Sequence, residues 1–268
     1  MTGDTVARKM LVLRSIAFNL YFYVNITLWL IVASPLLLLP GAVLWRVVAS
    51  WSRLNLVMLK WLAGIDVELR GLEHLPDTPV IVASKHQSAW ETVSLLHLFR
   101  RPAFVLKREL MWVPLFGWYA AHTGMIPVNR GKGLPVLRAM VAAARQVAAD
   151  GRQIVIYPEG TRRAPGAQPA YKQGVAYLYR ELGLPVVPIA LNSGLYWPRR
   201  GFLRHPGTIV VEFLPAIEPG LEPQQFFQQL QDKIETATDR LLAEAARSVA
   251  PPPLSSEIRD RIAAITKT

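Results

Sequence analysis

The pattern of hydrophobic and polar positions sets the first part of the chain apart from the rest. Between Arg14 and Arg46 lie 31 residues without a formal charge, interrupted by prolines at Pro35 and Pro40. Twenty helical residues cover about 30 Å, so the stretch before Pro35 is long enough to cross a hydrocarbon core. The pattern therefore predicts a membrane segment near the N-terminus.

A cleaved signal peptide is the alternative for this stretch. Arg8, Lys9 and Arg14 precede the apolar run, and the sequence Val-Ala-Ser at 32–34 weakly resembles a cleavage site. A proline follows directly, and the apolar run is longer than is usual for a signal peptide. Both features argue against cleavage, and we favour a retained segment.

The next segment, residues 42–64, has a two-sided pattern. Arg46, Arg53 and Lys60 recur every seven residues and so lie in one stripe of a helix. Apolar residues with spacings of three and four follow another face, namely Val47, Trp51, Leu54, Met58 and Trp61. This combination suits a helix in the membrane interface, with tryptophans at headgroup depth and cations near anionic phosphates. A helix packed on the domain with a solvated basic edge would show the same pattern.

Together these segments predict an N-terminal two-helix membrane anchor over residues 1–64. The positive-inside rule places the basic N-terminus in the cytoplasm. If the first segment alone crossed the bilayer, the N-terminus and the main domain would lie on opposite sides. We therefore expect a shallow or re-entrant hairpin that keeps both on the cytoplasmic face of the inner (plasma) membrane.

Short β-branched runs alternate with helical stretches further on, which predicts an α/β domain over residues 65–250. The predicted strands are 66–71, 79–85, 103–107, 125–128, 153–158, 186–191 and 208–213. Helices are predicted at 134–150, 172–182 and 222–247, the first two stopped by glycine. We expect a mixed sheet layered with helices, followed by a C-terminal tail over 251–268.

Composition narrows the partners and the chemistry. A net charge of +11 points to an anionic partner. Eight tryptophans and a positive mean hydropathy favour an anionic membrane over nucleic acid. The chain has no cysteine, which excludes disulfides, thiolate-zinc sites and thiol catalysis.

His86 and Glu91 stand five positions apart in SKHQSAWET, residues 84–92. On a continuous helix five residues turn through about 500°, which leaves the two side chains about 140° apart. If Ser88 begins the helix, His86 lies in the preceding turn, where Glu91 can accept its Nδ1 hydrogen and leave Nε2 as a base. The same carboxylate can instead close a capping box with Ser88. The residues alone leave both uses open.

Cations and glycines follow other predicted strands. They are Lys107 at the end of 103–107, Arg130 and Lys132 after 125–128, and Glu159, Gly160, Thr161, Arg162 and Arg163 after 153–158. In open α/β sheets ligands gather beyond the carboxyl ends of the strands. Backbone N–H groups beside glycine and the planar fork of arginine suit a phosphate. Taken singly, each cation is better explained as a solvated surface charge. Their joint placement after strands makes a phosphate site an equal alternative, and we predict one there.

Four segments, KHQSAWET, GMIPVNR, YPEGTRR and VVPIAL, resemble the four ordered blocks of the glycerolipid acyltransferases and cover residues 86 to 191. The resemblance implies direct acyl transfer from an acyl thioester, on coenzyme A or acyl carrier protein, to the hydroxyl of lysophosphatidic acid, giving phosphatidic acid. It implies neither a metal nor a further cofactor. The first block departs from the family pattern, because Glu91 stands where aspartate is usual and Lys85 where asparagine is common.

The resemblance also implies roles for the candidate residues. His86 would remove the hydroxyl proton and Glu91 would stabilise the imidazolium. The phosphate would be held by Lys107, Arg130 and Arg162, with the turn Glu159, Gly160, Thr161, in which Glu159 orients an arginine or the loop. The alternatives are acylation of another lysolipid, such as a lyso-ornithine lipid or another lysophospholipid, and a noncatalytic lipid-binding membrane protein.

Overall fold

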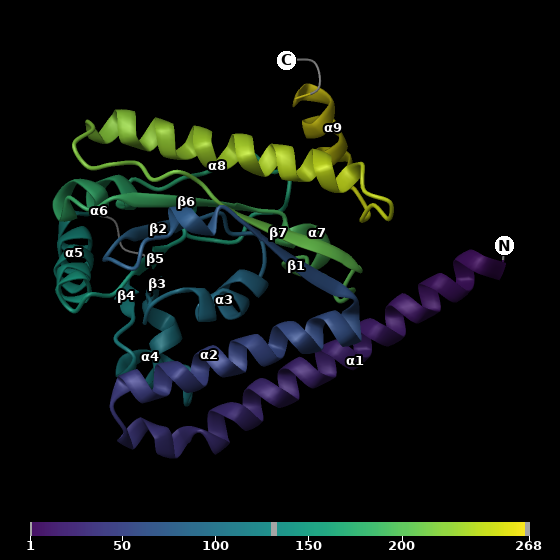
Figure 1. The fold of residues 1–268 in the computed structure, drawn as a ribbon, viewed down its shortest axis with the longest axis horizontal. Helices are drawn as coiled ribbons and strands as arrows, with labels where there is room; N and C mark the ends of the chain where they lie inside the picture. The colour runs from purple at the N-terminus through teal and green to yellow at the C-terminus, as the bar shows by residue number, and fades with distance from the viewer. Residues whose placement is uncertain (1, 130–132, 266–268) are drawn as a thin grey trace.

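The computed structural model describes residues 2–129 and 133–265, whose strands form one seven-stranded sheet (Figure 1). The strands are β1 (Ile65–Arg70), β2 (Ile81–Ser84), β3 (Ala103–Lys107), β4 (Ile126–Val128), β5 (Ile154–Ile156), β6 (Val186–Leu191) and β7 (Gly207–Phe213). Their order is β1-β7-β6-β2-β5-β3-β4, and neighbours run parallel except β6 and β7. The predicted mixed sheet and all seven predicted strands are confirmed.

Two helical layers cover the sheet. On one face lie α5 (Leu134–Ala149), α6 (Gly174–Leu182) and α8 (Pro223–Ala246), and on the other α1 (Thr2–Val32), α2 (Gly41–Met58) and α3 (Trp90–Ser94) (Figure 1). Ile81 and Ala83 of β2 join the core beneath the first group, whereas Val82 joins the core with Phe18 and Trp90. Because the central strands are buried on both faces, their sequences read as continuous apolar runs.

The remaining elements are short connections and a last helix. They are the short helices α4 (Phe116–His122) and α7 (Ser193–Tyr196), the 3-10 turns η1 (Ser34–Leu38), η3 (Leu72–His74), η4 (Leu96–Leu98) and η5 (Arg108–Trp112), and the π turn η2 (Leu59–Ala63). The segment 251–268, which we expected to be a tail, contains α9 (Ser256–Ile265). Its Ile258 is buried, and Arg261 forms an ion pair of 2.7 Å with Asp239 of α8.

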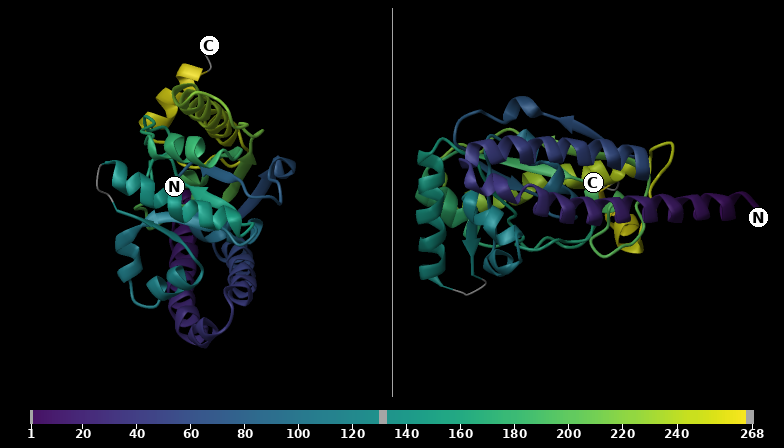
Figure 2. Two further views of the ribbon diagram at one scale, coloured as in Figure 1. Left: turned by 90° about the vertical axis from the view of Figure 1, so that its left-hand side faces the viewer. Right: turned by 90° about the horizontal axis from the view of Figure 1, so that it is seen from below.

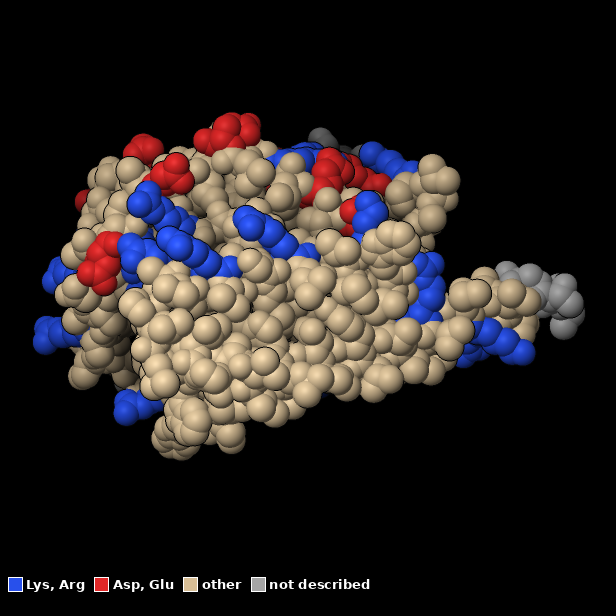
Figure 3. Space-filling model, turned by 60° about the horizontal axis from the view of Figure 1, so that its bottom comes forward, with Lys and Arg blue, Asp and Glu red and all other residues tan. Residues whose placement is uncertain are grey.

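The helices α1 and α2 form an antiparallel hairpin beneath the domain (Figures 1 and 2). The chain turns between them at η1, where Pro35 lies. By length and composition alone, residues 5–32 and 41–63 are each long and apolar enough to cross a membrane. Figure 3 shows that this side of the molecule is a broad surface with almost no charged side chains, bordered by lysines and arginines.

The helix α1 contacts the domain along much of its length. The backbone N–H of Arg204 donates to Ser15 Oγ at 2.9 Å, and Asn19 Nδ2 donates to the Phe202 carbonyl oxygen at 2.9 Å. Further along, the Leu30 carbonyl accepts a hydrogen bond of 3.0 Å from another part of the domain, Tyr119 Oη. From Ser15 to Leu30 these contacts cover about 22 Å of helix, so α1 lies along the domain from Ser15 onward, while its first turns extend beyond it (Figure 1).

The faces of α2 differ from the sequence-based expectation. Trp51, placed on the predicted membrane face, is buried, and its Nε1 donates to Asn25 Oδ1 of α1 at 2.7 Å. Leu54 and, beyond the helix, Trp61 are exposed. The basic stripe of Arg46, Arg53 and Lys60 is exposed as predicted. A helical period marks the apolar positions, but it does not say which of them face protein and which face lipid.

Candidate active site

His86 and Glu91 are brought together by a strand, a turn and a short helix. The strand β2 ends at Ser84, and α3 begins at Trp90, two residues later than the predicted start. His86 Nδ1 lies 2.9 Å from Glu91 Oε1. The Glu91 side chain is fully buried, whereas 14% of the His86 side chain is exposed. The spacing that fails on a continuous helix therefore works across the turn.

Glu91 also fixes the turn that carries His86. Its Oε1 accepts hydrogen bonds of 2.7 Å from the backbone N–H groups of Gln87 and Ser88. Its Oε2 accepts one of 2.8 Å from Ser193 Oγ, which follows β6. Capping and orienting the histidine are therefore not rival uses of this carboxylate, because the same oxygen does both.

The imidazole of His86 is held on its other sides as well. Its ring stacks on Tyr157, with 4.0 Å between ring centroids and 21° between planes. The backbone N–H of Arg163 donates to the His86 carbonyl at 2.8 Å. No hydrogen bond from the described part of the chain reaches Nε2. Burial raises the pKa of the Tyr157 phenol well above its ordinary value, and the Glu91 charge raises it further, so Tyr157 packs as a neutral ring.

The candidate phosphate residues follow the carboxyl ends of neighbouring parallel strands. Thr161 and Arg162 are half-buried in the turn after β5, and Gly160 has a left-handed φ of 64° there. Lys107 ends β3, which pairs in parallel with β5. Because the carboxyl ends of parallel strands lie together, Lys107, this turn and His86 are all found at the C-terminal end of the sheet. Arg130 lies outside the described residues.

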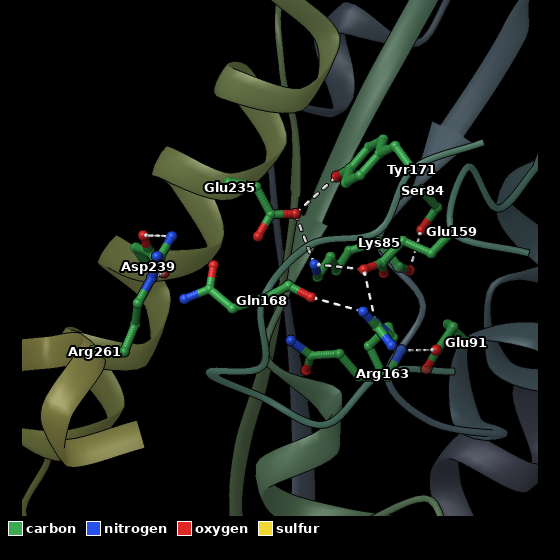
Figure 4. Close-up of polar contacts among 11 residues, drawn as sticks. Ser84, Lys85, Glu91, Glu159, Arg163, Gln168, Tyr171, Glu235, Asp239 and Arg261 are labelled. Atoms are coloured by element: carbon green, nitrogen blue, oxygen red, sulfur yellow. Dashed lines mark hydrogen bonds and ion pairs between the residues drawn. The ribbon is translucent and has the colours of Figure 1, made fainter. Parts of the chain in front are cut away.

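Glu159 belongs to a buried cluster of charges (Figure 4). Lys85, only 3% exposed, places its Nζ 3.2 Å from Glu159 Oε1 and 2.6 Å from Glu235 Oε1 of α8. Tyr171 Oη donates to the same Glu235 oxygen at 2.8 Å. Burial raises the pKa of Glu159, the nearby Lys85 opposes this, and Glu235 adds to it. Glu159 thus faces Lys85, which links the turn after β5 to Glu235 of α8.

Several residues of the site were not singled out from the sequence. Tyr157 and Ser193 follow β5 and β6, so the strand-end rule that selected the cations could have found them. Glu235 lies 150 positions from Lys85 and carries no local signal. Within the described ranges 2–129 and 133–265, no group of three or more His, Cys, Asp or Glu residues could hold a metal ion.

Comparison with known proteins gives a consistent result. The acyltransferase family model matches residues 66–192. A 1-acyl-sn-glycerol-3-phosphate acyltransferase of Pseudomonas aeruginosa is 37% identical over 198 residues, which cover 74% of this chain and 77% of that protein. The 1-acyl-sn-glycerol-3-phosphate acyltransferase alpha of Mus musculus is 30% identical over 213 residues, covering 77% and 74%.

The fold is also that of a solved structure. The crystal structure of the 1-acyl-sn-glycerophosphate (LPA) acyltransferase from Thermotoga maritima superposes with a TM-score of 0.72. It covers 85% of this chain and 96% of that one at 19% identity, which supports the fold alone. From the sequence relatives and the matched blocks, the chain belongs to the acyltransferase family that includes the 1-acyl-sn-glycerol-3-phosphate acyltransferases.

Proposed function

We propose that this protein transfers an acyl group from an acyl thioester to the free hydroxyl of lysophosphatidic acid, giving phosphatidic acid. The single observation that carries the proposal is the contact of 2.9 Å between His86 Nδ1 and the buried carboxylate of Glu91, with the histidine partly exposed. The names of the sequence relatives support the acceptor.

The reaction follows from the orientation of the imidazole. With its Nδ1 hydrogen bonded to Glu91, His86 presents Nε2 as the base that takes the acceptor's hydroxyl proton. The oxygen then attacks the thioester carbonyl carbon, an ester bond forms, and the carbon–sulfur bond breaks. The imidazolium returns the proton to the leaving thiolate. Glu91 stabilises the imidazolium between these steps, and such proton transfer contributes about 10² to 10⁴ in rate.

In this proposal the acceptor's phosphate lies beyond the C-terminal ends of β3 and β5. Arg162, Thr161 and Gly160 approach it from the turn after β5, and Lys107 approaches it from β3. Arginine can bind two phosphate oxygens at once, and the glycine leaves the backbone accessible. Arg130 completes the proposed set. The buried ion pair of Lys85 with Glu159 supports the position of the turn without contacting the substrate.

The hairpin of α1 and α2 is proposed to lie in the cytoplasmic face of the inner membrane. Its contacts along the domain favour a hairpin in the membrane plane over a crossing by α1 alone. The broad uncharged surface with its basic border suits an anionic bilayer. An acidic acyl carrier protein would also be attracted to a chain of net charge +11, and both it and coenzyme A are proposed donors.

A panel of acceptors and donors tests the proposal. Purified protein in mixed micelles is given lysophosphatidic acid, another lysophospholipid or a lyso-ornithine lipid, with acyl-coenzyme A or acyl-acyl carrier protein, and products are identified by mass. We expect phosphatidic acid, lost in His86→Ala and retained in the matched control His74→Ala on η3. A higher rate of transfer to an acceptor without phosphate would identify that lipid, and not lysophosphatidic acid, as the substrate. Unchanged transfer in His86→Ala would refute the mechanism.

A further inference from the structure

Outside the α1–α2 hairpin, residues 110–118 present a second group of exposed apolar side chains. Trp112 is 78% exposed and Trp118 64%, with Leu110 at 39% and Val113 at 45%. We call these four residues the Trp112 patch. Single exposed apolar residues are ordinary, but several together, two of them tryptophans, mark an interaction surface.

The backbone beneath the patch is tightly built. Leu115 has a positive φ of 62°, and the N–H of Phe116 donates to the Pro114 carbonyl at 2.7 Å. A bulky residue at positive φ is a strained conformation, which persists only where the surroundings impose it. Gly117 lies against the Met111 carbonyl oxygen, which a Cβ atom at Gly117 would overlap. The patch is therefore carried on a defined scaffold.

The patch continues the surface of the hairpin. The Tyr119 ring lies 5.3 Å from that of Trp29, and His122 Nε2 lies 2.8 Å from the Leu39 carbonyl oxygen. At the turn of the hairpin α4 also borders α2, because a Cβ atom at Gly41 would lie 3.3 Å from the His122 carbonyl oxygen, and Figure 2 shows the hairpin from two further sides. The α1–α2 hairpin and the segment of η5 and α4 thus border one another on the same side of the domain.

The chemistry around the patch selects lipid as its occupant. Tryptophan combines an apolar ring with an N–H donor and is enriched where membranes meet water. The strand-ending Lys107 and the exposed Arg108 precede the patch and are separated from it by the exposed Glu109, so two cations and one carboxylate lead into it. Cations at that position suit anionic headgroups, while the indole rings enter the interface.

We infer that the Trp112 patch is a second membrane contact, which seats the domain on an anionic bilayer together with the α1–α2 hairpin. The inference rests on the proposed membrane anchor and deepens it. A hairpin alone leaves the domain free to roll about the hairpin axis. A second contact outside the hairpin fixes that angle and brings the end of β3, with its candidate phosphate residue Lys107, to headgroup level. The acceptor then reaches the site while its acyl chain stays in the bilayer.

Labelling at single cysteines tests the inference directly, because the natural chain has no cysteine. Trp112→Cys and Trp118→Cys of the full chain are labelled with a polarity-sensitive fluorophore. Leu20→Cys reports on α1, and Val249→Cys is the control at an exposed apolar residue beyond α8. Vesicles contain phosphatidylglycerol and phosphatidylethanolamine in equal amounts, with or without brominated acyl chains as quenchers.

We expect quenching at positions 20, 112 and 118 and none at 249. Quenching at 20 without quenching at 112 and 118 would overturn the second contact and leave the anchor intact. Absence of quenching at all positions would overturn the anchor itself, and the inference with it. As a second measurement, the double variant Trp112→Ser/Trp118→Ser should lower the ratio of activity in vesicles to activity in micelles by about tenfold, whereas Val249→Ser should not. An unchanged ratio would contradict the seating role.

Discussion

Replacing Glu91 with glutamine removes a charge from the proposed site while keeping its shape. The Oε1 position of Glu91 accepts three N–H groups, from His86, Gln87 and Ser88. An amide nitrogen placed there would face three donors, so the glutamine oxygen takes that position. The amide nitrogen then meets Ser193 Oγ, whose hydroxyl can rotate to accept. We therefore expect Glu91→Gln to fold with the His86 tautomer unchanged.

The loss of activity follows from the charge alone. A hydrogen bond to a charged group contributes about 1.5 to 3 kcal/mol, against about 0.5 to 1.5 kcal/mol for a neutral pair. Here the difference grows as His86 becomes an imidazolium, and losing about 1.5 to 3 kcal/mol in the transition state lowers kcat about 10- to 160-fold. KM for the lysolipid should change little, because the Glu91 side chain is fully buried and out of the substrate's reach.

The assay is the initial rate of phosphatidic acid formation with both substrates saturating, with thermal unfolding followed by circular dichroism as the check on folding. Ser193→Ala is the control, because it removes only the bond to Oε2 and keeps both the Glu91 charge and its contact with His86, so kcat should fall less than in Glu91→Gln. Near-normal turnover of a folded Glu91→Gln variant would refute the reasoning and leave Glu91 as a helix cap. A loss near 10⁴ would contradict the assigned amide orientation, since a wrong histidine tautomer has an effect of that size.

Three further predictions concern the same framework. Glu91→Asp shortens the side chain by about 1.5 Å, which takes the carboxylate out of reach of His86 and of the Gln87 and Ser88 N–H groups. We expect kcat to fall at least about tenfold and the urea midpoint to fall as well, because the buried carboxylate loses hydrogen bonds; full activity at an unchanged midpoint would show that α3 can shift. Lys85→Met removes the cation shared by Glu159 and Glu235 and leaves Glu159 only Arg163 Nε at 3.9 Å. The free energy of unfolding should fall by about 3 to 5 kcal/mol, and adding Glu235→Gln should restore part of it; an unchanged urea midpoint would contradict the buried pairing. Burial and the nearby Arg53 lower the pKa of His97 in the folded protein. The unfolded chain, whose His97 keeps a pKa of about 6.5, therefore binds the proton more readily. Stability is unaffected by His97 above that pH and falls as the pH drops from there toward the lowered pKa of the folded state. His97→Gln should therefore flatten the loss of urea stability between about pH 7.5 and 5.5, and an unchanged slope would assign that loss to other groups.

The sheet could be predicted because its strands are marked locally. Runs such as 186–191 are β-branched and buried on both faces, and a continuous apolar run between turn residues suffices to recognise them. The antiparallel pairing of β6 with β7 was not predicted, because strand order depends on contacts between distant segments. The helix α9 was missed for a different reason, since the prolines at 251–253 mark a break in the chain and do not determine the structure of the residues after them.

The candidate site likewise contains residues that local sequence rules bring together and residues that only the complete fold brings together. The geometry of His86 and Glu91 follows from a strand, a turn and a helix within nine residues, so local rules were enough. Ser193 reaches Glu91 across 102 positions, and only the fold brings them together. For Trp51 the difficulty was physical: protein and lipid are both apolar surroundings, and a hydrophobic stripe cannot tell which one it will meet.

The contact between α1 and the segment after α7 has a consequence for biosynthesis. Ser15 accepts a hydrogen bond from the backbone of Arg204, 189 positions later, and Phe18 packs edge-on against Trp197. At typical elongation rates the first partner leaves the ribosome roughly 10 to 40 s before the second. During that interval the apolar residues of α1 that will be buried have no protein to cover them. Early delivery of the nascent hairpin to the bilayer would shield that surface until the domain is complete and can dock on it.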